Sequence, residues 1–177
     1  MIPYLKNFSH EYCITIEEKK FPFTLKDIEL YHGKNKRNGW YLQQLFKLYA
    51  GFVIPGILET YTVIDADVLF LKKKEIFENN IPIYNYGSEF HQPYFDHMEK
   101  LHPDLVKMDK VKSGICHFMT FQKKYILELF NLVESYHNGM EFWKVFLLNV
   151  ARENILYSGA SEYEIYFNFM LKYHRDK

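Results

Sequence analysis

One stretch of twelve residues, TYTVIDADVLFL at 60–71, restricts the possible folds of this chain more than any other. Its apolar side chains predict a strand that is buried in a core. Two carboxylates, Asp65 and Asp67, stand in the middle of it, one residue apart. Two like charges in apolar surroundings cost free energy unless a partner neutralises them. The stretch therefore predicts a buried strand whose end carries a binding site.

We expect the apolar side chains of this stretch to face the interior of the molecule. The segment before it, WYLQQLFKLYAGF at 40–52, repeats apolar residues at helical spacing. Leu45 and Leu48 of this predicted helix should therefore pack close to the strand. The strand side chains that we expect inside are Val63, Ile64, Val68 and Phe70.

Strand and helix patterns alternate along the rest of the chain. Residues 12–18 alternate in polarity and predict a strand, whereas residues 21–39 have little periodicity and predict a loop. The later patterns predict a short strand in 81–87, a short helix within 88–112, a glycine turn and apolar run in 113–124, and helices in 125–139, 140–151 and 158–174. This order predicts one α/β domain over residues 1–177, built on a mainly parallel sheet.

Composition and charge exclude several classes of protein. The 177 residues contain 22 Lys and Arg against 22 Asp and Glu, so the basic excess of a nucleic-acid-binding protein is missing. No apolar run approaches the roughly 20 residues of a membrane span, and MIPYLKNFSHEY at the start lacks the apolar centre of a secretory signal. Cys13 and Cys116 form neither a disulfide framework nor a metal-binding spacing. We therefore expect a cytoplasmic protein without a transmembrane segment.

The paired aspartates have three interpretations. In an extended strand, residues two apart face the same side, so Asp65 and Asp67 would form an oxygen-rich site for Mg²⁺ or Mn²⁺ that also binds the phosphates of a ligand. Alternatively, one aspartate caps the following turn and the other pairs with a lysine among 72–74. A third possibility is the nucleophilic aspartate of haloacid-dehalogenase-type phosphatases. That D-x-D-x-[TV] motif fits less well, because Leu69 occupies its fifth position.

Three motifs resemble the GT-A-fold glycosyltransferases. NGWYLQQLFKLYAGFVIPGILETYTVIDADVLFL at 38–71 resembles their nucleotide-sugar-binding core, especially in the pattern W-Y-x-Q-Q-x-x-K-L ahead of I-D-A-D. SGICHFMTF at 113–121 resembles the glycine-containing loop of that fold, and GASEYEIYFNFM at 159–170 its acidic motif near the acceptor. The resemblance covers the chain from about residue 12 onward and implies a GT-A-like, Rossmann-like domain shortened at its N-terminus.

The resemblance implies a donor site around the aspartates. Asp67 would bind the metal ion directly, and Asp65 would contact the metal or the donor ribose. Lys47 would neutralise donor phosphate or orient Asp65, unless it is a solvated helix residue. Four further residues would line this site, of which Gln43 shares the helix face of Lys47 at i, i+4: Gln43, Gln44, Trp40 and His117. Trp40 and His117 could instead be packing residues of the core.

The resemblance also implies catalytic and acceptor residues. Glu162 would take a proton from the acceptor hydroxyl in an inverting enzyme, although it also fits the first turn of a helix capped by Ser161. His174 would complete the metal site. Within NYGSEFHQPYFDHM at 85–98, three residues would contact the acceptor: His91, Tyr94 and His97.

The function implied by the resemblance is metal-dependent transfer of a sugar from a nucleotide-sugar donor to a saccharide or other hydroxyl acceptor, with Mn²⁺ or Mg²⁺ as cofactor. Whether the transfer inverts or retains configuration stays open. One alternative is a non-catalytic relative that binds nucleotide or sugar, or a partner subunit. The phosphatase is the less favoured alternative. Donor turnover with Mn²⁺ distinguishes the enzyme from the non-catalytic relative.

Overall fold

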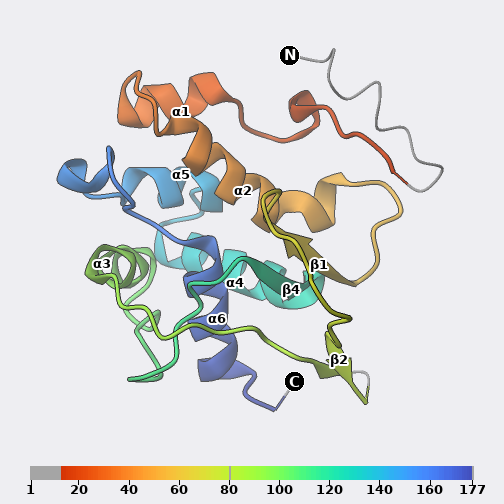
Figure 1. The fold of residues 1–177 in the computed structure, drawn as a ribbon. Helices are drawn as coiled ribbons and strands as arrows, with labels where there is room; N and C mark the ends of the chain where they lie inside the picture. The colour runs from red at the N-terminus through yellow and green to blue at the C-terminus, as the bar shows by residue number, and fades with distance from the viewer. Residues whose placement is uncertain (1–12, 80, 177) are drawn as a thin grey trace.

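The computed structural model describes residues 13–79 and 81–176 (Figure 1). These residues form a mixed α/β fold of six α-helices and two small antiparallel sheets. In chain order the helices and strands are α1 (Leu25–His32), α2 (Asn38–Val53), β1 (Thr60–Ile64), β2 (Phe77–Glu78), β3 (Ile81–Pro82), α3 (Gln92–Leu101), β4 (Phe118–Gln122), α4 (Lys123–Tyr136), α5 (Phe142–Leu148) and α6 (Glu162–Tyr173). Short 3₁₀ helices span Glu18–Lys20 and Arg152–Asn154.

The larger sheet pairs β1 with β4. The two strands are antiparallel, and their register places Tyr61 opposite Phe121 and Ile64 opposite Phe118. The other strand pair among the described residues, β2 with β3, is also antiparallel. The mainly parallel sheet that we expected is therefore absent from residues 13–79 and 81–176. Because β4 pairs with β1 in the antiparallel direction, a strand parallel to β1 would have to come from a different segment of the chain.

The strand expected at residues 12–18 does not form in its described part. Residues 13–17 have no regular structure and Glu18 begins a 3₁₀ helix, while residue 12 lies outside the described part of the chain. Glu17 and Lys19 pair at 2.5 Å, with both side chains more than half exposed. Residues 13–17 pair with neither of the two sheets among the described residues.

The helix α6 lies at the centre of the fold. Every residue from Glu162 to Met170 is buried, and α2, α3 and α4 pack against this helix. Tyr166 packs against Phe121 of β4, with their ring centroids 4.8 Å apart. An almost wholly buried helix needs contacts on every face, and the surrounding elements supply them.

The helices expected in the second half of the chain are confirmed. The segments 125–139, 140–151 and 158–174 contain α4, α5 and α6, and the helix expected within 88–112 is α3. Asn138 and Gly139 follow the end of α4 with positive φ angles of 56° and 79°, as expected for residues that end a helix. Among the described residues, no helix combines the length and the apolar character needed to span a membrane.

Residues 21–39 are not the loop that we expected, because they contain the helix α1. Thr24 precedes the helix, and its backbone N–H donates to Asp27 Oδ2 at 2.7 Å, which is half of a capping box. Ile28 is fully buried and fixes one face of α1 in the core. The aspartate in place of the usual glutamate makes this helix start harder to recognise in the sequence.

The burial expected for the 60–71 stretch is only partly found. Leu45 and Leu48 are fully buried, and Val63 and Val68 are half-buried. Ile64 and Phe70 are 47% and 42% exposed, so their expected burial is wrong. The reason is that β1 ends at Ile64, and the chain then turns away from the core. The buried residue of β1 itself is Tyr61.

Candidate functional site

A lysine that is largely shielded from solvent joins two acidic residues that are far apart in the sequence. Lys47 Nζ lies 2.5 Å from Asp65 Oδ1 and 2.7 Å from Glu162 Oε1. Lys47 comes from α2, Asp65 follows β1, and Glu162 is the first residue of α6. The three side chains are 12%, 20% and 5% exposed, so the cluster is largely shielded from solvent. The structure thus brings together three residues that the sequence placed in one site.

A turn at the end of β1 positions the aspartates. The Asp65 backbone N–H donates to the His117 carbonyl at 2.9 Å, and the Val68 N–H donates back to the Asp65 carbonyl at 3.1 Å. Asp65 and Asp67 therefore stand on a turn and not in an extended strand, as the shared-face argument assumed. Asp67 is exposed. The expected pairing of an aspartate with a lysine from 72–74 is replaced by the pair with Lys47.

Glu162 is held by its backbone as well as by its side chain. Its N–H donates to Gln44 Oε1 at 3.0 Å, and Ser161 Oγ accepts from the Glu164 N–H at 3.2 Å, which confirms the expected cap of α6. Gln44 is buried, whereas Gln43 is exposed, so the glutamine that reaches the cluster is not the one favoured by helix spacing. Gln44 and Lys47, one turn apart on α2, together fix the start of α6.

Tyr163 belongs to the cluster, although the sequence analysis did not include it. Its hydroxyl donates to Asp65 Oδ1 at 3.2 Å, and Lys47 Nζ lies 4.4 Å from the centroid of its ring. Burial raises the pKa of the Tyr163 hydroxyl, and the carboxylates of Glu162 and Asp65 raise it further. The hydroxyl therefore stays protonated and acts as a donor. In the sequence, the position of Tyr163 directly after Glu162 was the feature that could have indicated its place in the site.

The charges of the cluster shift the pKa of both ion-pair partners. Burial raises the pKa of Glu162, and Lys47 opposes this shift without cancelling it. Burial alone would lower the pKa of Lys47, but Glu162 and Asp65 together hold it above its ordinary value. Lys47 is thus a permanent cation, and Glu162 accepts a proton more readily than an exposed glutamate does.

The glycine loop, residues 113–117, packs directly on the first turns of α6. A Cβ atom on Gly114 would lie 2.6 Å from Phe167 Cβ and 2.7 Å from the Tyr163 carbonyl oxygen, so the contact requires glycine. Ser113 Oγ also donates to Glu164 Oε2 at 2.7 Å. This packing holds the loop where the carbonyl of His117, its last residue, accepts from the Asp65 N–H.

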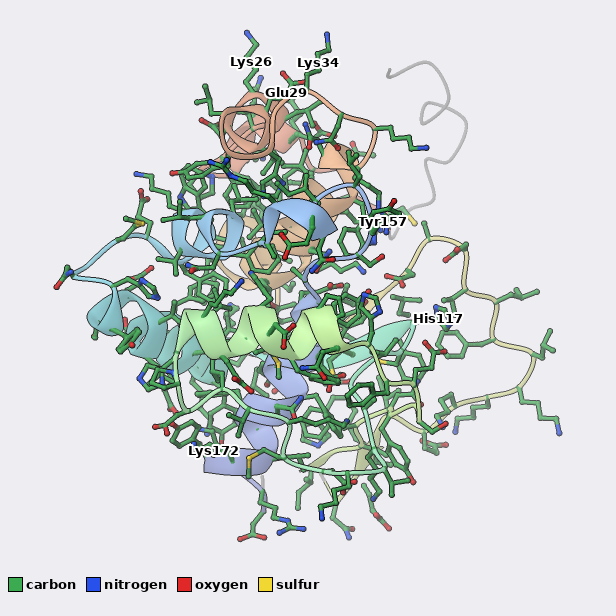
Figure 2. The ribbon with its side chains drawn as sticks, turned by 90° about the vertical axis from the view of Figure 1, so that its left-hand side faces the viewer. Lys26, Glu29, Lys34, His117, Tyr157 and Lys172 are labelled. Carbon is green, nitrogen blue, oxygen red and sulfur yellow. The ribbon has the colours of Figure 1, made fainter. Side chains whose placement is uncertain are left out.

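His117 is an exposed residue next to Asp65. Its side chain is 79% exposed, and its Nδ1 lies 3.9 Å from Asp65 Oδ2. The alternative that His117 is a core histidine is therefore wrong. In Figure 2, the labelled His117 and Tyr157 lie on the same side of the molecule.

The three residues expected to contact an acceptor have different environments. His91 Nε2 donates to the Ser158 carbonyl at 2.7 Å, and its ring lies 4.5 Å from the ring of Tyr94. Burial raises the pKa of Tyr94, and the Glu162 carboxylate adds to the shift, which places Tyr94 within the field of the cluster. His97 instead lies in the core, 2% exposed, where its Nε2 donates to the Phe146 carbonyl at 2.8 Å. No acceptor can reach it there.

His174 does not come near the aspartates. It follows the last residue of α6, a helix of 12 residues that is about 18 Å long, whereas Glu162 is the first residue. Its Nε2 lies 2.6 Å from Glu128 Oε2, and its ring lies 4.1 Å from that of Tyr125. Figure 2 labels Lys172, close to this distant end of α6.

The fit of a metal ion to Asp65 and Asp67 depends on other ligands. The described residues contain no group of three His, Cys, Asp or Glu side chains that could hold a metal ion. Asp65 Oδ1 already accepts from Lys47 and Tyr163, which leaves Oδ2 and the exposed Asp67 carboxylate. Magnesium is usually bound by one or two carboxylates together with substrate phosphates. The donor set therefore fits a metal shared with a phosphorylated ligand and does not fit a closed protein cage.

Trp40 and two hollows lie away from the cluster. Trp40 is half-buried against the core, with the Arg37 guanidinium 4.4 Å above its ring, so packing accounts for its position. One hollow of about 300 Å³ lies at the C-terminal end of α6 and is partly lined by His174. Another, of about 430 Å³, lies beside β1. Neither hollow is lined by a residue of the Lys47 cluster.

Comparison with known proteins gives a family. A model described as "Family of unknown function (DUF6492)" matches residues 4–175. The chain belongs to this family. A comparison with curated proteins found no match, and a comparison with solved structures also found none.

Proposed function

We propose that this protein is a metal-dependent glycosyltransferase of the GT-A type, which transfers a sugar from a nucleotide-sugar donor to a hydroxyl acceptor. The observation that supports the proposal is the buried cluster in which Lys47 bridges Asp65 and Glu162. The I-D-A-D motif and the acidic motif that resemble this family contribute one acid each. Burying a lysine between two carboxylates costs desolvation free energy, which favours a chemical role for the arrangement.

In this proposal, Glu162 accepts the proton of the acceptor hydroxyl. A general base must be held rigidly and must have a pKa close to the working pH. Gln44 holds the backbone of Glu162 and Lys47 holds its side chain, while burial raises its pKa. Tyr163 and Lys47 fix Asp65 Oδ1, and Oδ2 would be the oxygen that binds the ligand or its metal ion. A general base at Glu162 would correspond to inversion of configuration, which the rate of Glu162→Gln tests.

The remaining residues of the proposed site bind and orient the two substrates. Mg²⁺ or Mn²⁺, held by Asp67 and Asp65 together with donor phosphates, would supply positive charge that neutralises those phosphates. The exposed His117 imidazole, next to Asp65, can donate a hydrogen bond to an oxygen of the nucleotide-sugar. His91 and Tyr94 would border the acceptor. The cytoplasmic location expected from the sequence remains a prediction.

The test combines nucleotide binding with turnover. Titration calorimetry of the full chain with UDP and GDP should show tighter binding when Mn²⁺ is present, because the nucleotide and the protein share the ligands of the ion. Asp67→Asn should remove this coupling. Glu162→Gln should slow transfer from the cognate nucleotide-sugar by about 10²- to 10⁴-fold and leave donor affinity nearly unchanged. Glu99→Gln, an exposed acid on α3, is the matched control and should retain the wild-type rate.

Other results would support the alternatives. Donor binding without any turnover across a panel of nucleotide-sugars and acceptors would indicate a non-catalytic relative. Hydrolysis of a phosphomonoester, with a phosphorylated Asp65, would indicate the phosphatase. A wild-type transfer rate in Glu162→Gln would remove Glu162 from the catalytic role.

A further inference from the structure

The segment that joins β1 to β2 exposes an unusual number of apolar side chains. Leu69 and Leu71 are 81% and 86% exposed. Between them, Phe70 is half-exposed and packs its ring against Phe118 of β4, with centroids 5.4 Å apart. Phe70 therefore attaches the segment to the sheet, while the two leucines point away from the protein. Figure 2 shows the connection after β1 projecting from the side of the molecule that carries His117.

Three lysines follow these leucines directly. Lys72, Lys73 and Lys74 are all exposed. Lys73 Nζ lies 2.8 Å from Glu75 Oε1, but both side chains are well exposed, so this pair holds Lys73 only weakly. Aliphatic side chains and cations thus occupy neighbouring positions on one projecting segment. We refer to residues 69–74 as the leucine–lysine segment.

We propose that the leucine–lysine segment binds the surface of an anionic lipid membrane. Leu69 and Leu71 would enter the boundary between headgroups and acyl chains, where their exposed area leaves water. The lysines would lie at the level of the headgroup phosphates, to which juxtamembrane lysines are attracted. This combination favours a lipid surface over a protein partner, because aliphatic tips beside clustered cations match an apolar layer beneath an anionic one.

The proposal is independent of the proposed function. The ion pairs and hydrogen bonds of Lys47 and Glu162 go to residues outside this segment, and binding to vesicles is measured without any donor or acceptor. The segment follows the turn of Asp65 and Asp67, so membrane binding would place that turn close to the lipid surface.

The experiment is flotation of the full chain with vesicles. Wild-type protein should float with vesicles that contain phosphatidylglycerol and should stay behind with phosphatidylcholine alone. High salt should weaken the binding, because the lysine attraction is screened. The triple substitution Lys72→Gln, Lys73→Gln, Lys74→Gln should reduce the partition coefficient about a hundredfold at low salt. The double substitution Leu69→Ser, Leu71→Ser should reduce it about tenfold or more.

Matched controls lie in α1 and in the residues directly after it. Leu30 is 82% exposed, close to the value for Leu71, so Leu30→Ser tests the loss of an exposed leucine elsewhere. Lys26, Lys34 and Lys36 are exposed, and Figure 2 labels the first two on the end that carries α1. Their triple change to Gln tests the loss of three charges. Both controls should float like the wild type, and circular dichroism should show that all variants are folded.

Three results would overturn the proposal. The first is wild-type protein that does not float with anionic vesicles. The second is an equal loss of binding in the controls, which would indicate a general charge effect. The third is a concentration-dependent dimer that Leu69→Ser, Leu71→Ser dissociates in the absence of vesicle binding, because the segment would then contact a second copy of the chain.

Discussion

At the scale of single residues, the site depends most on Lys47. Its ammonium group is the cation shared by two carboxylates, one of which is only 5% exposed. Removing one member of a buried ion pair leaves the other charge without compensation, which costs far more than losing a surface pair. Lys47 is therefore needed for stability as well as for the proposed chemistry.

Replacing Lys47 with Met should destabilise the fold in a pH-dependent way. We expect the free energy of unfolding to fall by about 3 kcal/mol at pH 8. Without Lys47 the folded-state pKa of Glu162 rises further, so the loss is full above that pKa and shrinks as the pH falls and Glu162 takes up a proton. Urea unfolding at pH 8 and pH 5 measures this difference. The exposed Lys34→Met should change stability by less than about 0.5 kcal/mol; an equal loss for Lys47→Met at both pH values would contradict the ion-pair argument.

At the scale of elements, the start of α6 is fixed by two other segments. The glycine loop packs on its first turns, and α2 holds Glu162 from the other side through Gln44 and Lys47. The first turn of α6 is therefore positioned more by tertiary contacts than by its own cap. A change in the glycine loop should disturb Glu162 without touching it.

Gly114→Ala should test this coupling. The added Cβ would approach the α6 backbone to 2.7 Å at the Tyr163 carbonyl, and a backbone cannot rotate away as a side chain can. We expect a loss of about 1–3 kcal/mol in unfolding free energy. Gly39→Ala is the control, because nothing lies within 4 Å of its added Cβ and it sits in α2; it should gain about 0.5–1 kcal/mol. Chemical denaturation measures the free energy of unfolding of both variants. An unchanged value for Gly114→Ala would mean that the glycine loop does not pack tightly on α6.

At the scale of the whole molecule, one buried histidine connects stability to pH. Burial lowers the pKa of His97 to about 4 from its ordinary 6.5. The unfolded chain therefore binds a proton at this residue between these two pKa values, whereas the folded chain does not. The contribution of His97 to stability is full above pH 6.5 and is lost as the pH falls toward 4.

Unfolding measured across this range should show the effect of His97. We expect the wild type to lose about 3 kcal/mol between pH 7 and pH 4 from this residue alone. His97→Gln keeps a donor for the Phe146 carbonyl and should flatten the slope of stability against pH, although it lowers stability at pH 7. If His97→Gln keeps the wild-type slope, the protein takes up the protons elsewhere.

The sequence located several helices but missed α1 and placed a strand at residues 12–18 that does not form in its described part. Helical spacing located α2 and α4, and two of the motifs named Lys47, Asp65 and Glu162, which the structure brings together. Helix spacing favoured Gln43, whereas Gln44 holds Glu162, because both lie within one turn of Lys47 and the contact depends on where α6 packs. The antiparallel direction of strand pairing could not be predicted either, because it depends on which segment pairs with β1 in the folded chain.

The bridging position of Lys47 has a consequence for proton linkage. An anionic ligand that attracts Lys47 draws counter-charge away from Asp65 and Glu162 at the same time. The pKa of Glu162, which Lys47 holds down, then increases, so the complex takes up protons from the buffer as it forms. The affinity for an anion that binds Lys47 consequently decreases as the pH rises. When the site fills, a proton replaces Lys47 as the group that compensates the charge of Glu162.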